Sequence, residues 1–170
     1  MSVFNSVRLV KFAAVLCVAF GMAACSKSPD ENGANGANLA GQGAGAATPG
    51  SAQDFVVNVG DRVFFETDST ELTPTAQATL DKQARWLNQY SRYSFTVEGH
   101  ADERGTREYN FALGARRSEV TKEYLVARGI SSSRMKTISY GKERPVSVCN
   151  DISCWSQNRR AVTVLSGGTS

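Results

Sequence analysis

The feature that most constrains this chain is the stretch from Val97 to Arg117, which reads VEGHADERGTREYNFALGARR. A strand-like segment ends at Gly99, the acid Asp102 follows in a Gly-flanked loop, and the remainder has the pattern of a helix. Asn110 and Arg117 are seven residues apart, and because each helical residue turns about 100°, they share one helix face two turns apart. The sequence therefore predicts a strand, an acidic loop and a helix that carries an amide and a guanidinium on one face.

A loop carboxylate opposed by a helical guanidinium suits a ligand that carries both an ammonium and a carboxylate group, as a zwitterionic amino acid does. Each ligand group can then make a charge-assisted hydrogen bond. Asp102 and Arg117 are the candidate binding residues, and Asn110 is the candidate for fixing the ligand's orientation. Leu113, from the same helix face, and Arg104, from the acidic loop, complete the expected set.

These residues resemble the signature of OmpA-like peptidoglycan-binding domains: an Asp after a Gly-His or Gly-Thr pair, then an Asn eight and an Arg fifteen residues later. The sequence GHADERGTREYN, together with SYGKERP at 139–145 and NRRAV at 158–162, is most similar to the peptidoglycan-associated lipoproteins of that family. The resemblance runs from about Val56 to Leu165, and its three motifs occur in the same order.

The resemblance implies a protein that is not an enzyme, needs no cofactor and binds peptidoglycan non-covalently at the meso-diaminopimelate of the stem peptide. It further implies a tether between outer membrane and cell wall in the Tol-Pal system, with TolB and other Tol proteins as partners, in envelope integrity and cell division. By the same resemblance, Thr67, Asp68 and Arg160 contact the ligand. Asp68 can also form an Asx-type turn, which does not exclude a ligand contact, and the alternative for Arg160 is a solvated or Glu-paired side chain.

The first 24 residues have the pattern of a secretory lipoprotein signal. Arg8 and Lys11 are basic, residues 12–22 are apolar but too few for a comfortable membrane span, and residues 23–24 are small. The Met-Ala-Ala-Cys ending resembles a lipobox, in which Cys25 is lipidated and becomes the first residue of the mature chain. The resemblance implies an outer-membrane anchor with the domain facing the periplasm. A simple cleaved signal or an uncleaved inner-membrane anchor is the alternative.

The sequence predicts three parts: a signal peptide at 1–24, a lipid anchor and flexible Gly/Ala/Asn-rich tether at 25–53, and an OmpA-like domain at 54–170. Residues 26–53 contain no aromatic side chain, so they cannot bury enough apolar area to offset their chain entropy. Two of the basic residues behind the net charge of +3 lie in the signal. The mature chain is therefore nearly neutral, which gives no support to nucleic-acid binding.

The folded part is predicted to be α+β, an OmpA-like βαβαβ-β sandwich with helices packed on one face of a mixed sheet. Thr73-Pro74 opens a helix that runs to about Tyr90, because Thr is a good cap and Pro fits the first helical position. A second helix is expected from about Arg107 to Arg128, with inward side chains at Leu113, Val120, Tyr124 and Ala127. The expected strands are a short edge strand at 55–59, a central strand at 62–65, and strands at 93–98, 135–140 and 161–165.

Two other features concern metals and disulfides. His100 is the only histidine, and since zinc sites usually take several His or Cys ligands, we expect a structural imidazole bonded near the site and no metal. Cys149 and Cys154 enclose four residues, and in an oxidising periplasm the natural expectation is a disulfide. A pair of metal ligands is the alternative.

Two other functions fit an exported wall-facing domain. A periplasmic hydrolase of wall peptides would need an activated nucleophile, a metal-bound water or paired carboxylates, and a chain with one His and no GxSxG motif offers little of this. A motor-associated wall anchor of the same fold is the other alternative. The lipobox argues against its transmembrane form.

Overall fold

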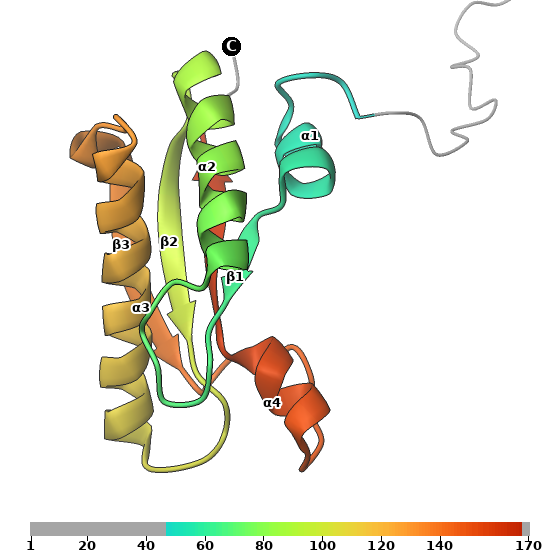
Figure 1. Ribbon diagram of the computed structural model, residues 1–170, viewed down its shortest axis with the longest axis vertical. Helices are drawn as coiled ribbons and strands as arrows, with labels where there is room; N and C mark the ends of the chain where they lie inside the picture. Colours follow the sequence, from blue (N-terminus) through green and yellow to red (C-terminus); the bar gives the residue numbers. More distant parts are fainter. Residues whose placement is uncertain (1–46, 168–170) are drawn as a thin grey trace, which may run out of the picture. The chain divides into compact units, whose positions relative to one another are not determined.

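The computed structural model describes residues 47–167, and its centre is a mixed β-sheet (Figure 1). The strands are β1 (Arg62–Phe64), β2 (Ser94–His100), β3 (Met135–Gly141) and β4 (Arg160–Ser166). Their spatial order is β1-β4-β2-β3, with β4 antiparallel to β1 and β2, and β3 parallel to β2. The predicted α+β class with a mixed sheet is confirmed.

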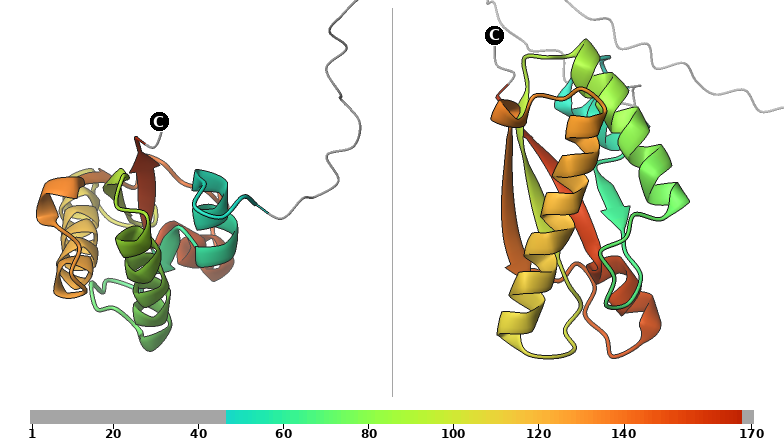
Figure 2. Two further views of the ribbon diagram at one scale, coloured as in Figure 1. Left: turned by 90° about the horizontal axis from the view of Figure 1, so that it is seen from above. Right: turned by 60° about the vertical axis from the view of Figure 1, so that its left-hand side comes forward.

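Two long helices, α2 (Pro74–Gln89) and α3 (Arg107–Ala127), lie on one face of this sheet (Figure 2). Thr73 caps α2 and Thr106 caps α3, each by accepting a hydrogen bond from the backbone N–H three residues on. Pro74 takes the first position of α2 as predicted, where its missing N–H is not needed. The cap at Thr106 fixes the point at which the acidic loop becomes helix.

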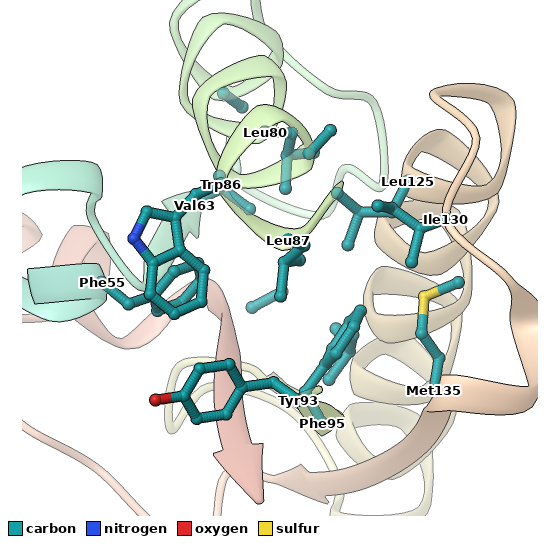
Figure 3. Packing of buried hydrophobic residues seen from close by; sticks show 14 of the residues in the cluster. Phe55, Val63, Leu80, Trp86, Leu87, Tyr93, Phe95, Leu125, Ile130 and Met135 are labelled. Carbon is teal, nitrogen blue, oxygen red and sulfur yellow. The ribbon is translucent and has the colours of Figure 1, made fainter. Parts of the chain in front are cut away.

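An apolar core fills the space between the helices and the sheet (Figure 3). Phe95 and Val97 of β2 both point into it, because alternate residues of a strand face the same side. Leu80 and Leu87 of α2 and Leu125 of α3 meet them, and all five side chains are at most 1% exposed. Figure 3 also labels Phe55, Val63, Trp86, Tyr93, Ile130 and Met135.

Helix α3 lies so close to β2 and β3 at Gly99 and Gly114 that neither position has room for a side chain. A Cβ atom on Gly99 would be 1.8 Å from the carbonyl oxygen of Gly114, and one on Gly114 would be 2.4 Å from Oγ of Ser139. Glycine is needed at both positions because backbone packs directly on backbone. This contact brings the Asn110 and Arg117 face of α3 toward the end of β2, where the acidic loop begins.

Residues 55–59 are helical and do not form the predicted edge strand. The short helix α1 (Ala52–Asp54) is capped by Ser51 and continues as one π-helical turn, η1 (Phe55–Val59). The β-branched and aromatic composition favours a strand, but the ring of Phe55 packs on Trp86 with centroids 4.9 Å apart. Tertiary packing thus overrides local propensity. Helical structure also begins before residue 54, the predicted start of the domain.

Three further predictions are wrong in detail. β1 is an edge strand, not a central one. Ala127 is exposed, and the buried residue near the end of α3 is Leu125. Segments predicted as loops contain two helical elements, a 3-10 turn η2 (Ser132–Arg134) and the helix α4 (Ile152–Asn158). α4 has only seven residues and begins at an Asp151 cap, so it has too few turns to show a helical periodicity.

None of the helices within residues 47–167 has the length and apolar character needed to cross a bilayer. The predicted signal peptide, Cys25 and most of the predicted tether lie outside the described residues.

Candidate functional site

The acidic loop and the predicted helix face meet at a cavity of about 200 Å³. It is lined by the loop after β1, the loop after β2, the first half of α3 and the residue before β4. The lining residues are Thr67, Asp68, Asp102, Arg104, Gly105, Tyr109, Asn110, Leu113, Arg117 and Arg159. Every predicted binding residue except Arg160 therefore lines one cavity. A larger groove of about 590 Å³, between the start of α3 and the end of β3, contains none of them.

Asn110 shapes the acidic loop. Its buried Nδ2 donates to the carbonyl oxygens of Arg104 at 2.7 Å and of Thr106 at 3.1 Å. Gly105, between those two residues, has a φ of +83°, a conformation that favours glycine. The amide donors that were expected to orient a ligand thus hold the loop that carries Asp102.

The carboxylate of Asp102 is held by two arginines. Arg104 donates from Nη2 to Oδ2 at 2.7 Å, from Nε to Oδ1 at 3.1 Å and from its backbone N–H to Oδ1 at 3.2 Å. Arg159 donates from Nη1 to Oδ2 at 3.3 Å. Burial by itself raises the pKa of Asp102, but the hydrogen bonds and charge of Arg104, with the bond from Arg159, lower it overall. Asp102 is therefore an anion at neutral pH.

Arg117 is fully buried and makes all its hydrogen bonds to backbone carbonyls. Nε donates to Ser69 at 2.9 Å, Nη1 to His100 at 2.9 Å and Nη2 to Glu66 at 3.1 Å. Within residues 47–167 it forms no salt bridge. Burial first, and then the nearby charge of Arg159, lowers the pKa of Arg117 to about 10. The group is still a cation at neutral pH, and two of its five N–H groups have no hydrogen bond to residues 47–167.

Asp68 faces the acidic loop across the cavity. It has a positive φ of 56°, and its Oδ1 accepts a hydrogen bond from the hydroxyl of Tyr109. Among the described residues no backbone N–H donates to its carboxylate, so the Asx-type turn considered above is not formed. Thr67 lines the same wall of the cavity.

Arg160 is not among the residues that line this cavity, so its ligand contact stays a prediction without support from the geometry. It is 4% exposed, and its guanidinium donates to the carbonyl oxygens of Asn158 at 3.3 Å and Arg144 at 3.2 Å. Neighbouring residues of a strand point to opposite sides, so the preceding arginine faces the cavity. Arg159 donates from Nε to the carbonyl of Phe65 at 3.0 Å in addition to its bond to Asp102.

His100 is buried as expected but is not hydrogen-bonded. Neither ring nitrogen has a partner within the described part of the chain, and Oε2 of Glu98 is 3.7 Å from Nε2. The ring lies beside that of Tyr140, with centroids 5.5 Å apart. Burial, followed by the charges of Arg160 and Arg144, lowers the pKa of His100 from its usual 6.5 to about 4. The imidazole is therefore neutral at physiological pH.

Cys149 and Cys154 form a disulfide, with Cα atoms 5.7 Å apart. Both sulfur atoms are used in this bond, so neither is a thiolate that could bind a metal. The two cysteines are therefore not a pair of metal ligands in this structure. Cys25, the predicted lipidation site, lies outside residues 47–167.

Besides Gly105, two residues whose side chains line the cavity, Arg159 and Tyr109, were not predicted from the sequence. Arg159 was part of the NRR motif, but the motif alone does not show which of its two arginines faces the site. The alternation of β4, in which Ala161 and Thr163 are buried on the helix side, indicates Arg159, two residues before Ala161. Tyr109 stands next to Asn110 on α3 and had no signal, because its contact with Asp68 joins residues that are distant in sequence.

The chain matches the OmpA family over residues 64–159, and it belongs to that family. Its relatives include the peptidoglycan-associated lipoprotein of Mesorhizobium japonicum, 63% identical over 161 residues, which are 95% of this chain and 94% of the relative. The crystal structure of the peptidoglycan-associated lipoprotein from Burkholderia pseudomallei is similar with a TM-score of 0.61 and 38% identity, over 62% of this chain and 90% of that one. The C-terminal domain of Helicobacter pylori MotB, with a TM-score of 0.60 and 19% identity over 64% of this chain and 85% of its own, shares the fold.

These comparisons confirm the OmpA-like fold and the resemblance to peptidoglycan-associated lipoproteins. The family is structural and non-enzymatic, which confirms that the chain is not an enzyme and removes the hydrolase alternative. As a relative of lipoproteins, the protein belongs to the cell envelope.

Proposed function

We propose that this protein binds peptidoglycan non-covalently through the meso-diaminopimelate of the stem peptide. The observation that carries the proposal is Arg117, a buried cation with no acidic partner in residues 47–167, in the cavity that also holds the anion Asp102. A buried charge without a partner is costly, so a ligand carboxylate that pairs with it is favoured. The side-chain end of diaminopimelate presents an ammonium and a carboxylate on the same carbon.

The charges of the cavity fit this zwitterion. The 3.3 Å contact between Arg159 and Asp102 is the longest of the bonds to that carboxylate. A ligand ammonium at Asp102 replaces it, and the ligand carboxylate then lies between Arg117 and Arg159. The zwitterion thereby separates the ion pair between Arg159 and Asp102. Each of these two side chains then has an oppositely charged group of the ligand as its neighbour. Arg104 stays on Asp102 and keeps its carboxylate oriented.

The remaining walls contribute shape. Leu113 offers an apolar surface to the methylene chain of the ligand, and Thr67 with Asp68 forms the wall opposite the acidic loop. Asn110 acts indirectly, through its bonds to the loop carbonyls. An uncharged cavity would bind the alkyl chain of a ligand equally well whether or not that ligand carried an ammonium group. The paired charges of this cavity therefore determine the class of ligand.

The cellular setting is part of the proposal. A lipid on Cys25 would hold the protein in the outer membrane, with the domain of residues 54–170 in the periplasm and residues 25–53 as its tether. The relatives that carry the name peptidoglycan-associated lipoprotein support this arrangement. We extend it to a tether between outer membrane and cell wall in the Tol-Pal system, with TolB and other Tol proteins as partners, in envelope integrity and cell division.

Co-sedimentation with purified sacculi tests the proposed binding. We expect the wild-type protein to pellet with diaminopimelate-type sacculi and an Asp102→Asn variant to remain largely in the supernatant, because it no longer offers a charge to the ammonium. Glu123→Gln is the matched control, since it removes an exposed acid of α3 that lies outside the cavity. Wild-type protein that fails to pellet would contradict the proposal.

A further inference from the structure

The segment from Cys149 to Asn158 is fixed at both of its ends. The disulfide joins Cys149, in the loop, to Cys154, in α4. Asn158 is 1% exposed, and its Oδ1 accepts hydrogen bonds from the N–H groups of Val146 at 2.9 Å and Ser147 at 3.2 Å. Its Nδ2 donates back to the carbonyl of Ser147 at 2.8 Å. The helix therefore has little freedom to turn or slide relative to the loop before it.

Trp155 directly follows the disulfide-bonded Cys154 and contacts Arg104, one of the residues that line the cavity. The guanidinium carbon of Arg104 lies 4.2 Å from the centre of its ring, a cation–π contact. The indole N–H of Trp155 donates to Oε1 of Glu103, the residue before Arg104. The same guanidinium of Arg104 bonds both carboxylate oxygens of Asp102. Arg104 thus lies between an aromatic face and the acid of the site.

The same helix also holds the second arginine of the site. The backbone N–H of Arg159 donates to the carbonyl of Trp155 at 3.1 Å, and Arg159 follows the end of α4. Both cations that contact Asp102 are therefore fixed by one short helix. The side chain of Arg104 is 40% exposed, so without the indole it would have many more rotamers available.

We propose that the disulfide-closed segment Cys149–Asn158 is a positioning device for the ligand site, and that Trp155 is the residue through which it acts. Trp155 holds Arg104, and Arg104 holds the Asp102 carboxylate in the orientation that a ligand ammonium needs. An acid that is already oriented loses less conformational freedom on binding, and this raises affinity. The proposal rests on the proposed function, because it concerns affinity for the same ligand.

The test measures binding of a disaccharide tripeptide muropeptide that ends in meso-diaminopimelate, by calorimetry with the full-length protein in detergent. Trp155→Leu should weaken binding roughly two- to fivefold, the range expected for losing one partly exposed cation–π contact. Trp155→Phe keeps an aromatic face and should stay near the wild-type affinity. Ile152→Ala is the control, because Ile152 lies on the same helix, is 62% exposed and touches no part of the cavity.

A double-mutant cycle shows whether Trp155 acts through Arg104. In an Arg104→Ala background, Trp155→Leu should have no further effect on affinity. An equal loss in both backgrounds would mean that Trp155 contacts the ligand itself, and wild-type affinity in Trp155→Leu would mean that it has no role; either result overturns the proposal. Absence of muropeptide binding by the wild-type protein would overturn the proposed function as well, so the two failures are distinguishable.

The role of the disulfide has its own readout without ligand. In the wild-type protein the ring of Trp155 should shift the NMR signals of the Arg104 side-chain protons upfield, and Trp155→Leu should remove that shift. The double variant Cys149→Ser with Cys154→Ser should reduce the shift and weaken muropeptide binding, while circular dichroism shows that the domain is folded. Unchanged Arg104 signals in this folded variant would refute the part assigned to the disulfide.

Discussion

Acid should destabilise this domain through one buried histidine. The pKa of His100 falls from 6.5 to about 4 on folding, because burial and the charges of Arg160 and Arg144 oppose its protonation. Between pH 6.5 and 4 the unfolded chain therefore binds more protons at this residue than the folded protein does. The stability contributed by the neutral ring is complete above pH 6.5 and decreases as the pH falls toward 4.

The size of the effect follows from the same values. A fall from 6.5 to about 4 corresponds to roughly 3 kcal/mol of unfolding free energy at about 1.4 kcal/mol for each pH unit. Among the described residues, Glu98 is the only acid in contact with the ring, and its Oε2 is 3.7 Å from Nε2 of His100. Pairing of the protonated imidazole with Glu98 would offset part of this loss of stability. Carboxylates with lowered pKa values, such as Asp102, add their own losses from about pH 5 downward, where the unfolded chain begins to protonate them.

Urea unfolding at several pH values between 4 and 8 measures this. The comparison is with His100→Phe, which keeps a ring in a site where neither imidazole nitrogen makes a hydrogen bond to the described residues. The wild-type protein should lose about 3 kcal/mol from pH 7 to pH 4, and the variant should lose much less over the same range. Parallel curves for the two proteins would refute the assignment of this pH dependence to His100.

Three further changes have definite expected outcomes. Gly114→Ala puts a Cβ atom 2.4 Å from Oγ of Ser139 in β3 and 2.9 Å from the carbonyl oxygen of Gly99 in β2, so thermal unfolding should show a loss of about 1–3 kcal/mol; an unchanged melting temperature would contradict the close packing of α3 on these two strands. Asn110→Ala leaves the carbonyls of the acidic loop without their donor, so stability should fall by about 1–3 kcal/mol in urea, and wild-type stability would contradict that role. Cys25→Ala should lack acyl mass and leave the membrane fraction; retention there with an unchanged N-terminal mass would exclude Cys25 as the lipidated residue.

Local patterns in the sequence were enough to predict most of the fold. Thr73-Pro74 sets the start of α2 through a cap and a missing N–H, both of which are properties of neighbouring residues. Phe55 shows the limit of such patterns. Its surroundings favour a strand, but a contact with Trp86, distant in sequence, makes it helical. Contacts of this kind leave no trace in a short window of sequence.

In the site, too, local patterns could be read from the sequence and contacts between distant residues could not. The seven-residue spacing of Asn110 and Arg117 correctly predicts a shared buried face on α3. The choice between two adjacent arginines depended on which alternate residues of β4 face the helices, because neighbouring positions point to opposite sides. The contacts of Arg117 with three backbone carbonyls could not be predicted either, because they depend on loops from two other parts of the chain.

The central claim is that the cavity recognises the carboxylate and the ammonium of diaminopimelate together. Arg117 also supports three backbone carbonyls, so replacing it would disturb the protein as well as the ligand contact. The ligand is therefore the better partner to change. A stem peptide with lysine in place of diaminopimelate keeps the side-chain ammonium and lacks the carboxylate. A stem peptide whose diaminopimelate carboxylate is amidated keeps the shape and lacks the negative charge.

Calorimetry with these three muropeptides and the wild-type protein tests the claim most directly. The diaminopimelate peptide should bind about 10- to 100-fold more tightly than either of the others, because each of those leaves a buried guanidinium without its partner, at a cost of about 1–3 kcal/mol. Asp102→Asn should weaken binding of all three, since each presents the ammonium. Equal wild-type affinity for the diaminopimelate and lysine peptides would contradict the account.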